Sequence, residues 1–234
     1  MQRVINFSGG RTSALMTIME YKEGDLVLFC DTGREDNKTY KFIHDFEAHE
    51  KIPIVWLKYD GGFERLTEKR KMLPNIMMRF CTVELKVRTA RRYLRSKGIK
   101  VYENLIGFRS DEQRRVNNHK EFWKTVITRF PLHEQGLDKK AVLDFWDAKE
   151  YDLEVEPILG NCDLCFLKGK NAIISILRKY PELADKWIAD EDKVGATYIK
   201  GISYKELLRL SKLPYFKQQN LFEIEPAFNC ACTA

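Results

Sequence analysis

The chain begins with two apolar runs separated by a stretch rich in serine and glycine. Val4–Phe7 precedes this stretch and Ala14–Met19 follows it. We interpret the order as strand, tight loop and helix, because consecutive glycines permit positive φ and close approach of a ligand. The free N–H groups that open a helix favour an anion such as phosphate. A plain turn is the alternative interpretation. The polar loop consists of Ser8, Gly9, Gly10, Arg11, Thr12 and Ser13.

Two further apolar runs end in polar loops of the same kind. Leu26–Cys30 leads into Asp31, Thr32 and Gly33, and Val101–Ile106 leads into Gly107–Arg109. Segments with helical spacing alternate with these runs, which indicates an α/β fold with a doubly wound, mostly parallel sheet. The carboxyl ends of parallel strands meet at one edge of a sheet. We therefore expect the three loops to face a common crevice.

The length of 234 residues suits one α/β domain with a small appended lobe. We place the α/β domain at residues 1–150 and a helical, cysteine-containing C-terminal lobe at residues 151–234. No apolar stretch reaches the ~20 residues of a membrane span, and the start does not resemble a signal peptide, so we expect a cytoplasmic protein. Six cysteines in a reducing compartment favour metal binding or redox chemistry over disulfides.

Positive charge is concentrated in one part of the chain. The formal net charge is +6, but residues 58–100 hold thirteen Lys and Arg against four Asp and Glu. This region could face a nucleic acid, a nucleotide with several phosphates, or only water. The charge alone does not choose among them.

Five segments, in the same order along the chain, carry a resemblance to a known family. They are Ser8–Ser13; Asp31–Gly33; Arg79–Thr82 with Leu85 and Lys86; Gly107–Arg109 with Glu112; and Cys162–Cys165. In these segments the chain resembles the PP-loop ATP pyrophosphatases, or adenine nucleotide alpha hydrolases, and more closely their phosphoadenosine-phosphosulfate (PAPS) reductase branch. The resemblance implies an adenine nucleotide ligand, which is ATP, PAPS or the unphosphorylated relative of PAPS, APS. Mg²⁺ could bind together with the nucleotide.

The resemblance also implies which residues bind the nucleotide. Arg109 would contact phosphate, and its alternative role is a surface salt bridge with Asp111 or Glu112. Asp31 could hydrogen-bond the ribose or hold a metal ion, and Lys86 could simply be a solvated charge. The full set of expected nucleotide-binding residues is Ser8, Gly9, Gly10, Arg11, Thr12, Ser13, Asp31, Thr32, Gly33, Lys86, Gly107, Arg109 and Arg115.

Cysteine positions raise the question of a metal. In the iron–sulfur branch of the family, adjacent cysteines and a downstream Cys-x-x-Cys bind the cluster, and here Phe80 replaces the first of the adjacent pair. Cys81, Cys162 and Cys165 can still hold a 4Fe-4S cluster with one open iron, or Cys230 or Cys232 could supply the fourth thiolate. Zinc is the alternative metal, and a buried thiol is the alternative role of Cys81. We assign Cys30, at the end of an apolar run, to the core.

The tail contains the expected catalytic residues, Cys230 and Cys232. In the reductases a tail cysteine attacks the sulfur of the sulfonucleotide, but the Glu-Cys-Gly motif is replaced here by Asn229-Cys230-Ala231-Cys232. We expect an enzyme acting at the α-phosphate or sulfate of its nucleotide, served by a thiol reductant such as thioredoxin. The first alternative is an ATP-dependent sulfurtransferase that thiolates tRNA or DNA. The second is a nonenzymatic nucleotide-binding module.

Overall fold

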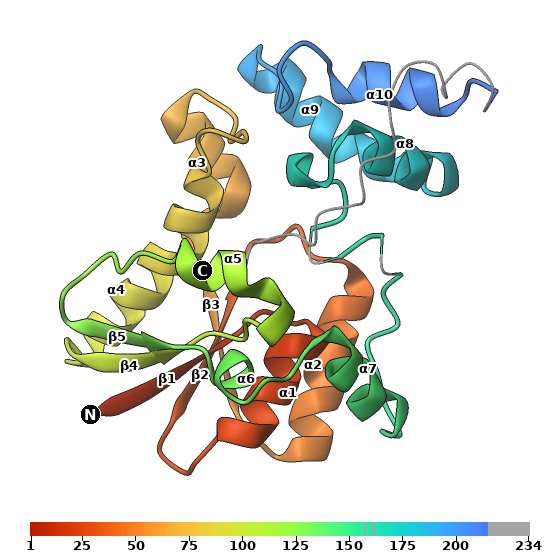
Figure 1. The fold of residues 1–234 in the computed structure, drawn as a ribbon. Coiled ribbons are helices and arrows are strands. Elements are labelled where there is room, and N and C mark those ends of the chain that lie inside the picture. The colour runs from red at the N-terminus through yellow and green to blue at the C-terminus, as the bar shows by residue number, and fades with distance from the viewer. Residues whose placement is uncertain (157, 161, 215–234) are drawn as a thin grey trace.

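The computed structural model describes residues 1–156, 158–160 and 162–214. Its five-stranded sheet is entirely parallel and has the order β3-β2-β1-β4-β5 (Figure 1). The expected α/β fold is therefore confirmed. From β1 at the centre, the chain adds β2 and β3 on one side and then crosses to add β4 and β5 on the other. The strands are β1 (Gln2–Phe7), β2 (Leu26–Asp31), β3 (Ile54–Lys58), β4 (Tyr102–Leu105) and β5 (Val126–Arg129).

Helices cover both faces of the sheet, and α3 and the last three α-helices of the described residues lie beyond its carboxyl edge (Figure 1). Short polar side chains open several of them, since Asp36, Asp138 and Ser203 accept hydrogen bonds from N–H groups of the first turns of α2, α7 and α10. The α-helices are α1 (Arg11–Glu20), α2 (Asn37–Glu50), α3 (Gly62–Arg70), α4 (Arg88–Ser96), α5 (Gln113–Asn117), α6 (Pro131–Glu134), α7 (Lys139–Asp147), α8 (Lys170–Lys179), α9 (Ala184–Val194) and α10 (Tyr204–Ser211). Four shorter or irregular helices are η1 (Thr82–Val87), η2 (Ser110–Glu112), η3 (Phe166–Lys168) and η4 (Pro181–Leu183).

The two faces of the sheet bury separate apolar clusters. On one face, Ile5 and Phe7 of β1 pack with side chains of α1, α2 and α7, including Phe46 and Trp146. On the other face, Val4 packs with side chains that include Leu94 of α4. The alternation of buried side chains along β1 produces both clusters, because successive residues of a strand point to opposite faces.

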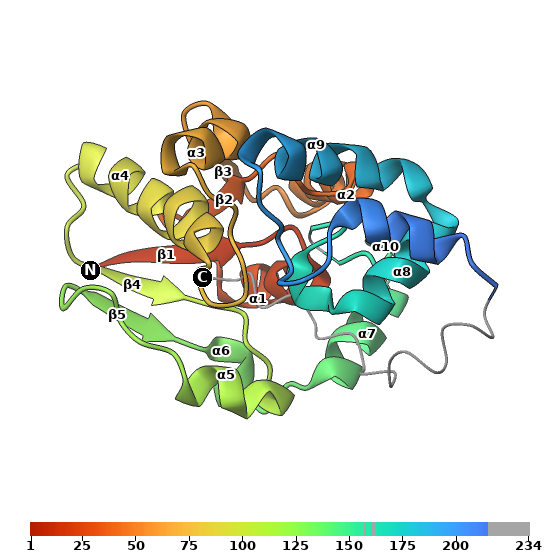
Figure 2. The ribbon, with the colours of Figure 1, turned by 90° about the horizontal axis from the view of Figure 1, so that it is seen from above.

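A third apolar cluster joins the C-terminal helices to α3 and η1. It contains Phe63 and Leu66 of α3, Leu85 of η1, and Ile173 and Leu177 of α8, all buried. Figure 2 shows α3 between α4 and α9, and buried side chains of α9 and α10 belong to the same cluster. The lobe that follows residue 150 therefore shares a core with residues from the first half of the chain.

Two sequence patterns that commonly begin a helix do not begin one here. Thr82 is of a residue type that often caps a helix, but it already lies inside η1, a π-helix that runs directly into α4. The Cys162–Cys165 segment precedes η3, and α8 begins only at Lys170. Gly169 has φ of +80°, which interrupts any helix between η3 and α8.

Candidate functional site

The loop between β1 and α1 is held by a glycine in a left-handed conformation. Gly9 has φ of +77°, and a Cβ at this position would lie 2.7 Å from Cγ2 of Thr39. Gly10 is extended and precedes α1 without a side-chain cap. Oγ of Ser13 accepts a hydrogen bond from the Ser8 N–H at 3.0 Å and lies 2.9 Å from its hydroxyl. The loop thus exposes the uncapped, positive end of the ten-residue helix α1.

The loop after β4 packs directly on the first turn of α1. A Cβ on Gly107 would lie 3.4 Å from Cα of Ser13 and 3.5 Å from the carbonyl oxygen of Thr12. Two residues later, Arg109 is 8% exposed and places Nη1 3.5 Å from Oγ1 of Thr12. The expected meeting of these two loops at the carboxyl edge is therefore what the structure contains.

Arg109 is also the centre of an ion-pair network. Its Nε and Nη2 atoms donate to the two carboxylate oxygens of Asp111, each at 2.9 Å, and Nη1 lies 3.5 Å from Glu112. Burial lowers the pKa of the Arg109 guanidinium, but the two carboxylates outweigh burial and raise it. Arg115 pairs with Glu112 and stacks over the ring of Phe108, with 4.1 Å between its guanidinium carbon and the ring centroid. Arg109 thus forms the salt bridges of its alternative role and also lies beside the glycine loop.

The loop after β2 brings two carboxylates to the same edge. Oδ1 of Asp31 accepts hydrogen bonds from the hydroxyl of Tyr40 at 2.7 Å and from the Gly33 N–H at 2.8 Å. Burial raises the pKa of Asp31, yet these hydrogen bonds and Lys58, 3.3 Å away, together lower it. Glu35 is buried and accepts hydrogen bonds from the N–H and hydroxyl of Thr32. Burial raises its pKa despite nearby Lys86.

Lys86 lies on η1, at the same edge as the loop after β2. Its ammonium lowers the pKa values of both Glu35 and Cys30 from nearby, and its carbonyl oxygen is 3.6 Å from Sγ of Cys30. Burial nevertheless raises the pKa of Cys30 to about 11, and this side chain packs with the cluster under α4, as expected for a core cysteine. Lys86 thus adds positive charge where β2 ends.

Arg11 makes a different contact from the one expected. Its Nε and Nη2 atoms donate to the carboxylate of Asp152, each at 2.6 Å, and Nη2 also donates to the carbonyl of Leu153. The Trp146 indole N–H donates to the Arg11 carbonyl at 2.9 Å. These contacts tie the glycine loop to the chain that follows α7, and a role of the Arg11 side chain in nucleotide binding stays a prediction.

Three of the expected metal ligands lie among the described residues. Cys81 is half-buried against the cluster shared with the C-terminal helices, Cys162 is half-buried, and Cys165 is buried. Among residues 1–156, 158–160 and 162–214, no group of three or more His, Cys, Asp or Glu side chains could hold a metal ion. A 4Fe-4S cluster or a zinc ion at these cysteines stays a prediction. Cys230 and Cys232 lie outside the described residues.

Three site residues were not singled out from the sequence: Arg34, Glu35 and Tyr40. Arg34 is 4% exposed and donates from Nη2 to Asp190 of α9 at 2.8 Å and to Glu64 of α3 at 3.0 Å. Charged residues directly after a buried strand were the available signal for Arg34 and Glu35. Nothing local distinguishes Tyr40, whose partner Asp31 is nine residues earlier.

A twisted parallel sheet with a glycine loop at a helix N-terminus and a buried arginine at its carboxyl edge defines an α/β protein of the anion- and nucleotide-binding class. The family model for the phosphoadenosine phosphosulfate reductase domain matches residues 2–159. The chain belongs to this family, within the PP-loop superfamily, and the resemblance seen in the sequence is confirmed.

Relatives of the chain are known by sequence. It is 30% identical over 204 residues to an uncharacterized nin region protein of Escherichia phage lambda, covering 74% of this chain and 68% of the phage protein. It is 26% identical over 209 residues to an uncharacterized protein of Methanocaldococcus jannaschii, covering 81% of this chain. The chain spans 49% of that archaeal protein, about half its length.

One solved structure is also similar. The PAPS reductase from Candida auris, in a phosphate complex, has a TM-score of 0.46 and 17% identity to this chain. The match covers 65% of this chain and 76% of the reductase. Separately, none of the described helices is long and apolar enough to span a lipid bilayer.

Proposed function

We propose that the chain is an enzyme that binds an adenine nucleotide at Ser8–Ser13 and acts at its α-phosphate or sulfate. The observation that carries the proposal is the contact between this loop and the loop of Gly107 and Arg109. Uncapped N–H groups at the start of α1 and a permanently charged guanidinium then face one anion. The nucleoside would bind at the end of β2, beside Asp31, Thr32 and Gly33. There the Asp31 carboxylate can accept a hydrogen bond from a ribose hydroxyl.

Electrostatic stabilisation is the main contribution that this site can make. An attacking group forms a bond to the α-phosphorus of ATP, the bond to the bridging oxygen breaks, and pyrophosphate leaves with the electron pair. Arg109 and the α1 N–H groups would stabilise the charge that develops on the phosphate oxygens. Lys86 would add charge from the opposite side of the crevice. With PAPS or APS as the nucleotide, the thiolate of Cys230 or Cys232, the predicted nucleophiles, would instead attack the sulfate sulfur. The bond between sulfur and the bridging phosphate oxygen would break, and the adenosine nucleotide would leave with the electron pair. An external dithiol would then release sulfite from the S-sulfocysteine and regenerate the cysteine, becoming a disulfide itself.

A second candidate function is ATP-dependent sulfur transfer to a nucleic acid. The observation that favours it is the positive charge of α4 and the turn after it. Residues 88–100 contain six Lys and Arg and no acidic residue. In that reaction, adenylation of the acceptor by ATP precedes displacement of AMP by a sulfur donor. The iron–sulfur cluster of the family stays a prediction, and neither reaction as written here uses it.

Calorimetric titration of the purified chain with ATP, PAPS and APS tests the nucleotide site. We expect saturable binding of at least one of them, and we expect Arg109→Ala to weaken it. Pyrophosphate release from ATP and sulfite release from PAPS with dithiothreitol then separate the two candidate reactions. Saturable binding without either product, with and without a nucleic acid acceptor, would support the nonenzymatic alternative. No binding of any of the three nucleotides would contradict the proposal.

A further inference from the structure

One outer surface of the molecule combines positive charge with an exposed aromatic side chain. It is formed by α4, with the turn that follows it, and by residues 119–124, and we call it the α4 surface. Arg88, Arg92 and Arg95 recur at helical spacing on α4 and are all exposed. Lys120 and Lys124 add two exposed cations from the neighbouring loop.

Few carboxylates neutralise this surface. Arg88 pairs with Glu84 at 2.7 Å, whereas Arg92 and Arg95 have no carboxylate partner within the part of the chain that the structure describes. Glu121 is the acidic residue of the loop, and its carboxylate accepts the Thr128 N–H at 2.8 Å. The potential over α4 is therefore positive, and it attracts a polyanion more strongly than an isolated anion.

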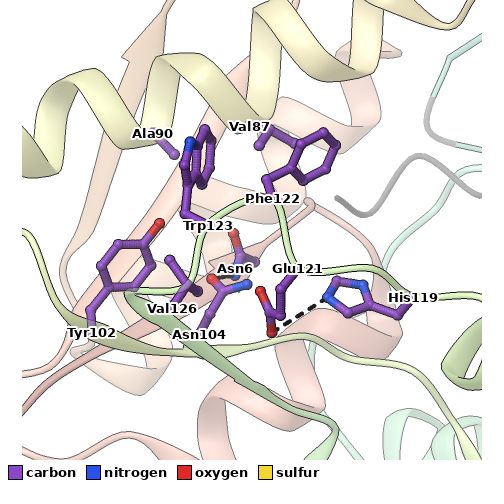
Figure 3. A pocket seen from close by; sticks show the side chains of 10 residues that line it. All are labelled: Asn6, Val87, Ala90, Tyr102, Asn104, His119, Glu121, Phe122, Trp123 and Val126. Atoms are coloured by element: carbon purple, nitrogen blue, oxygen red, sulfur yellow. Dashed lines mark hydrogen bonds and ion pairs between the residues drawn. The ribbon is translucent and has the colours of Figure 1, made fainter.

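Two aromatic rings of the neighbouring loop lie beside η1 and α4. The guanidinium of Arg91 stacks over Trp123, with 3.7 Å between the guanidinium carbon and the ring centroid. Phe122 is 58% exposed, although exposure of so large an apolar ring to water is unfavourable. Figure 3 shows Phe122 beside Val87 of η1 and Trp123 beside Ala90 of α4, at a small cavity.

The cavity reaches from the α4 surface toward the strands that carry the nucleotide loops. Its volume is about 50 Å³, and Asn6 of β1 and Asn104 of β4 line its floor, joined by a hydrogen bond of 2.6 Å. Asn6 lies two residues before Ser8, and Asn104 three residues before Gly107. These amides are already paired, since Asn6 also donates to the Leu105 carbonyl at 3.0 Å and Asn104 donates to the Thr128 hydroxyl at 3.3 Å. The aromatic rings at the wall are therefore the groups that can contact the face of a heterocyclic base.

We propose that the α4 surface binds single-stranded nucleic acid, with phosphates along Arg88, Arg92 and Arg95 and one base stacked on Phe122. Cationic grooves with exposed aromatic rings are typical of single-strand binding, because every base offers a face for stacking. A duplex keeps its bases stacked inside and would not use Phe122. This inference rests on the second candidate function, since it supplies the acceptor for a nucleotide bound at the neighbouring sheet edge.

Fluorescence anisotropy with labelled oligonucleotides of about 15 nucleotides, as single-stranded RNA, single-stranded DNA and duplex DNA, tests the proposal. We expect the full chain to bind the single strands more tightly than the duplex. The double variant Arg92→Glu, Arg95→Glu should bind at least tenfold more weakly. Its salt dependence should be shallower by about 1.4 in log–log slope, about 0.7 for each lost phosphate contact. Phe122→Ala should weaken binding roughly five- to a hundredfold without changing that slope.

The matched control is Lys139→Glu, Lys140→Glu, which makes the same change in net charge on α7, on the opposite face of the sheet. Equal losses in the control and in the α4 double variant would overturn the proposal, because net charge alone would explain them. Tighter binding of the duplex, an unaffected Phe122→Ala variant, or equally strong displacement by polyglutamate would also overturn it. Circular dichroism confirms that each variant is folded.

Titration of the same variants with ATP keeps this inference separate from the nucleotide site. We expect Arg92→Glu, Arg95→Glu and Phe122→Ala to bind ATP as the parent does, since none of these residues belongs to that site. If the parent binds oligonucleotides but no adenine nucleotide, the proposed function fails while the α4 surface is supported. If ATP binds and the single strands do not, the α4 proposal fails alone.

Discussion

At the scale of single residues, two adjacent glycines have different tasks. Gly9 needs its left-handed backbone and its lack of a Cβ, whereas Gly10 has φ of −109° and ψ of 158°, a conformation open to other residues. Gly10 is also the residue that precedes the first N–H groups of α1. Gly9 therefore sets the backbone turn of the loop, and Gly10 leaves space in front of the α1 N–H groups.

Gly9→Ala should destabilise the protein by about 2–4 kcal/mol. The alanine must adopt positive φ, and its Cβ meets Thr39, so strain and overpacking add. Urea denaturation followed by circular dichroism measures the loss. Gly10→Ala is the control and should stay close to the parent; equal losses in both variants would contradict the different roles of these glycines.

Gly10→Val should remove nucleotide binding while the protein stays folded. Valine prefers the extended backbone that Gly10 already has, but its branched side chain would occupy the space in front of the α1 N–H groups. Calorimetry with ATP and PAPS, next to a denaturation curve, tests both parts. A stable Gly10→Val protein that binds nucleotide like the parent would show that the anion does not bind at this loop.

Arg109→Ala should lose about 1.5–3 kcal/mol of nucleotide affinity, the scale of a charge-assisted hydrogen bond. Arg129→Ala is the control, because Arg129 forms an exposed pair with Glu134. Nucleotide dissociation constants of the parent and both variants give the answer. An Arg109→Ala variant with parental affinity would leave Arg109 as only the partner of Asp111 and Glu112.

The lowered pKa of Asp31 predicts a pH dependence of stability. The pKa of Asp31 in the folded state is lower than the value of about 3.9 in an unfolded chain. The charged carboxylate therefore stabilises the folded state fully above about pH 4. This stabilisation is lost as the pH falls through the lower folded-state pKa. Parent and Asp31→Asn should therefore differ in free energy of unfolding at pH 6, and the difference should shrink toward pH 2.5. A difference that is constant across this range would show that the charge of Asp31 is not responsible.

At the scale of elements, Arg34 joins three parts of the chain. It follows β2, pairs with Glu64 of α3 and Asp190 of α9, and stacks over the rings of Phe63 and Trp187. Asp190 also accepts the hydroxyl of Tyr198 at 2.7 Å. The carboxyl end of β2 and the C-terminal helices thus meet at the buried guanidinium of Arg34.

Arg34→Met should cost about 3–5 kcal/mol of stability, because Asp190 would remain buried without its cation. Adding Asp190→Asn to this variant should recover part of the loss, since the uncompensated charge is then removed. Denaturation of the two single variants and the double variant gives the coupling energy. Strict additivity of the two changes would contradict a direct pairing of Arg34 with Asp190.

At the scale of the whole molecule, the third apolar cluster bears on whether residues 1–150 form an independent domain. Side chains of α3 and η1, which belong to the predicted domain of residues 1–150, are buried against α8 and its neighbours. Removing the C-terminal helices would expose these side chains to water, at about 25 cal/mol for each Å² of apolar surface. The same cluster contains Leu164 and Phe166, the neighbours of Cys165 in the sequence.

A chain ending at residue 150 should therefore aggregate or unfold more readily than the full chain. Size-exclusion chromatography and thermal denaturation, with the full chain as reference, measure this. A soluble truncated protein with a cooperative transition would support residues 1–150 as an independent domain. It would also show that the shared cluster is dispensable.

The sequence by itself determined the parallel sheet, the glycine loop, the family and the meeting of three loops at one edge. These features follow from short-range constraints, such as positive φ at Gly9, apolar runs that end in polar loops, and the shared direction of parallel strands. Only the tertiary structure decided that Arg11 pairs with Asp152 and that Arg34 pairs with Asp190 of α9. The reason is that a side chain's partner depends on which distant segments pack beside it, and neither spacing nor residue type encodes that packing locally.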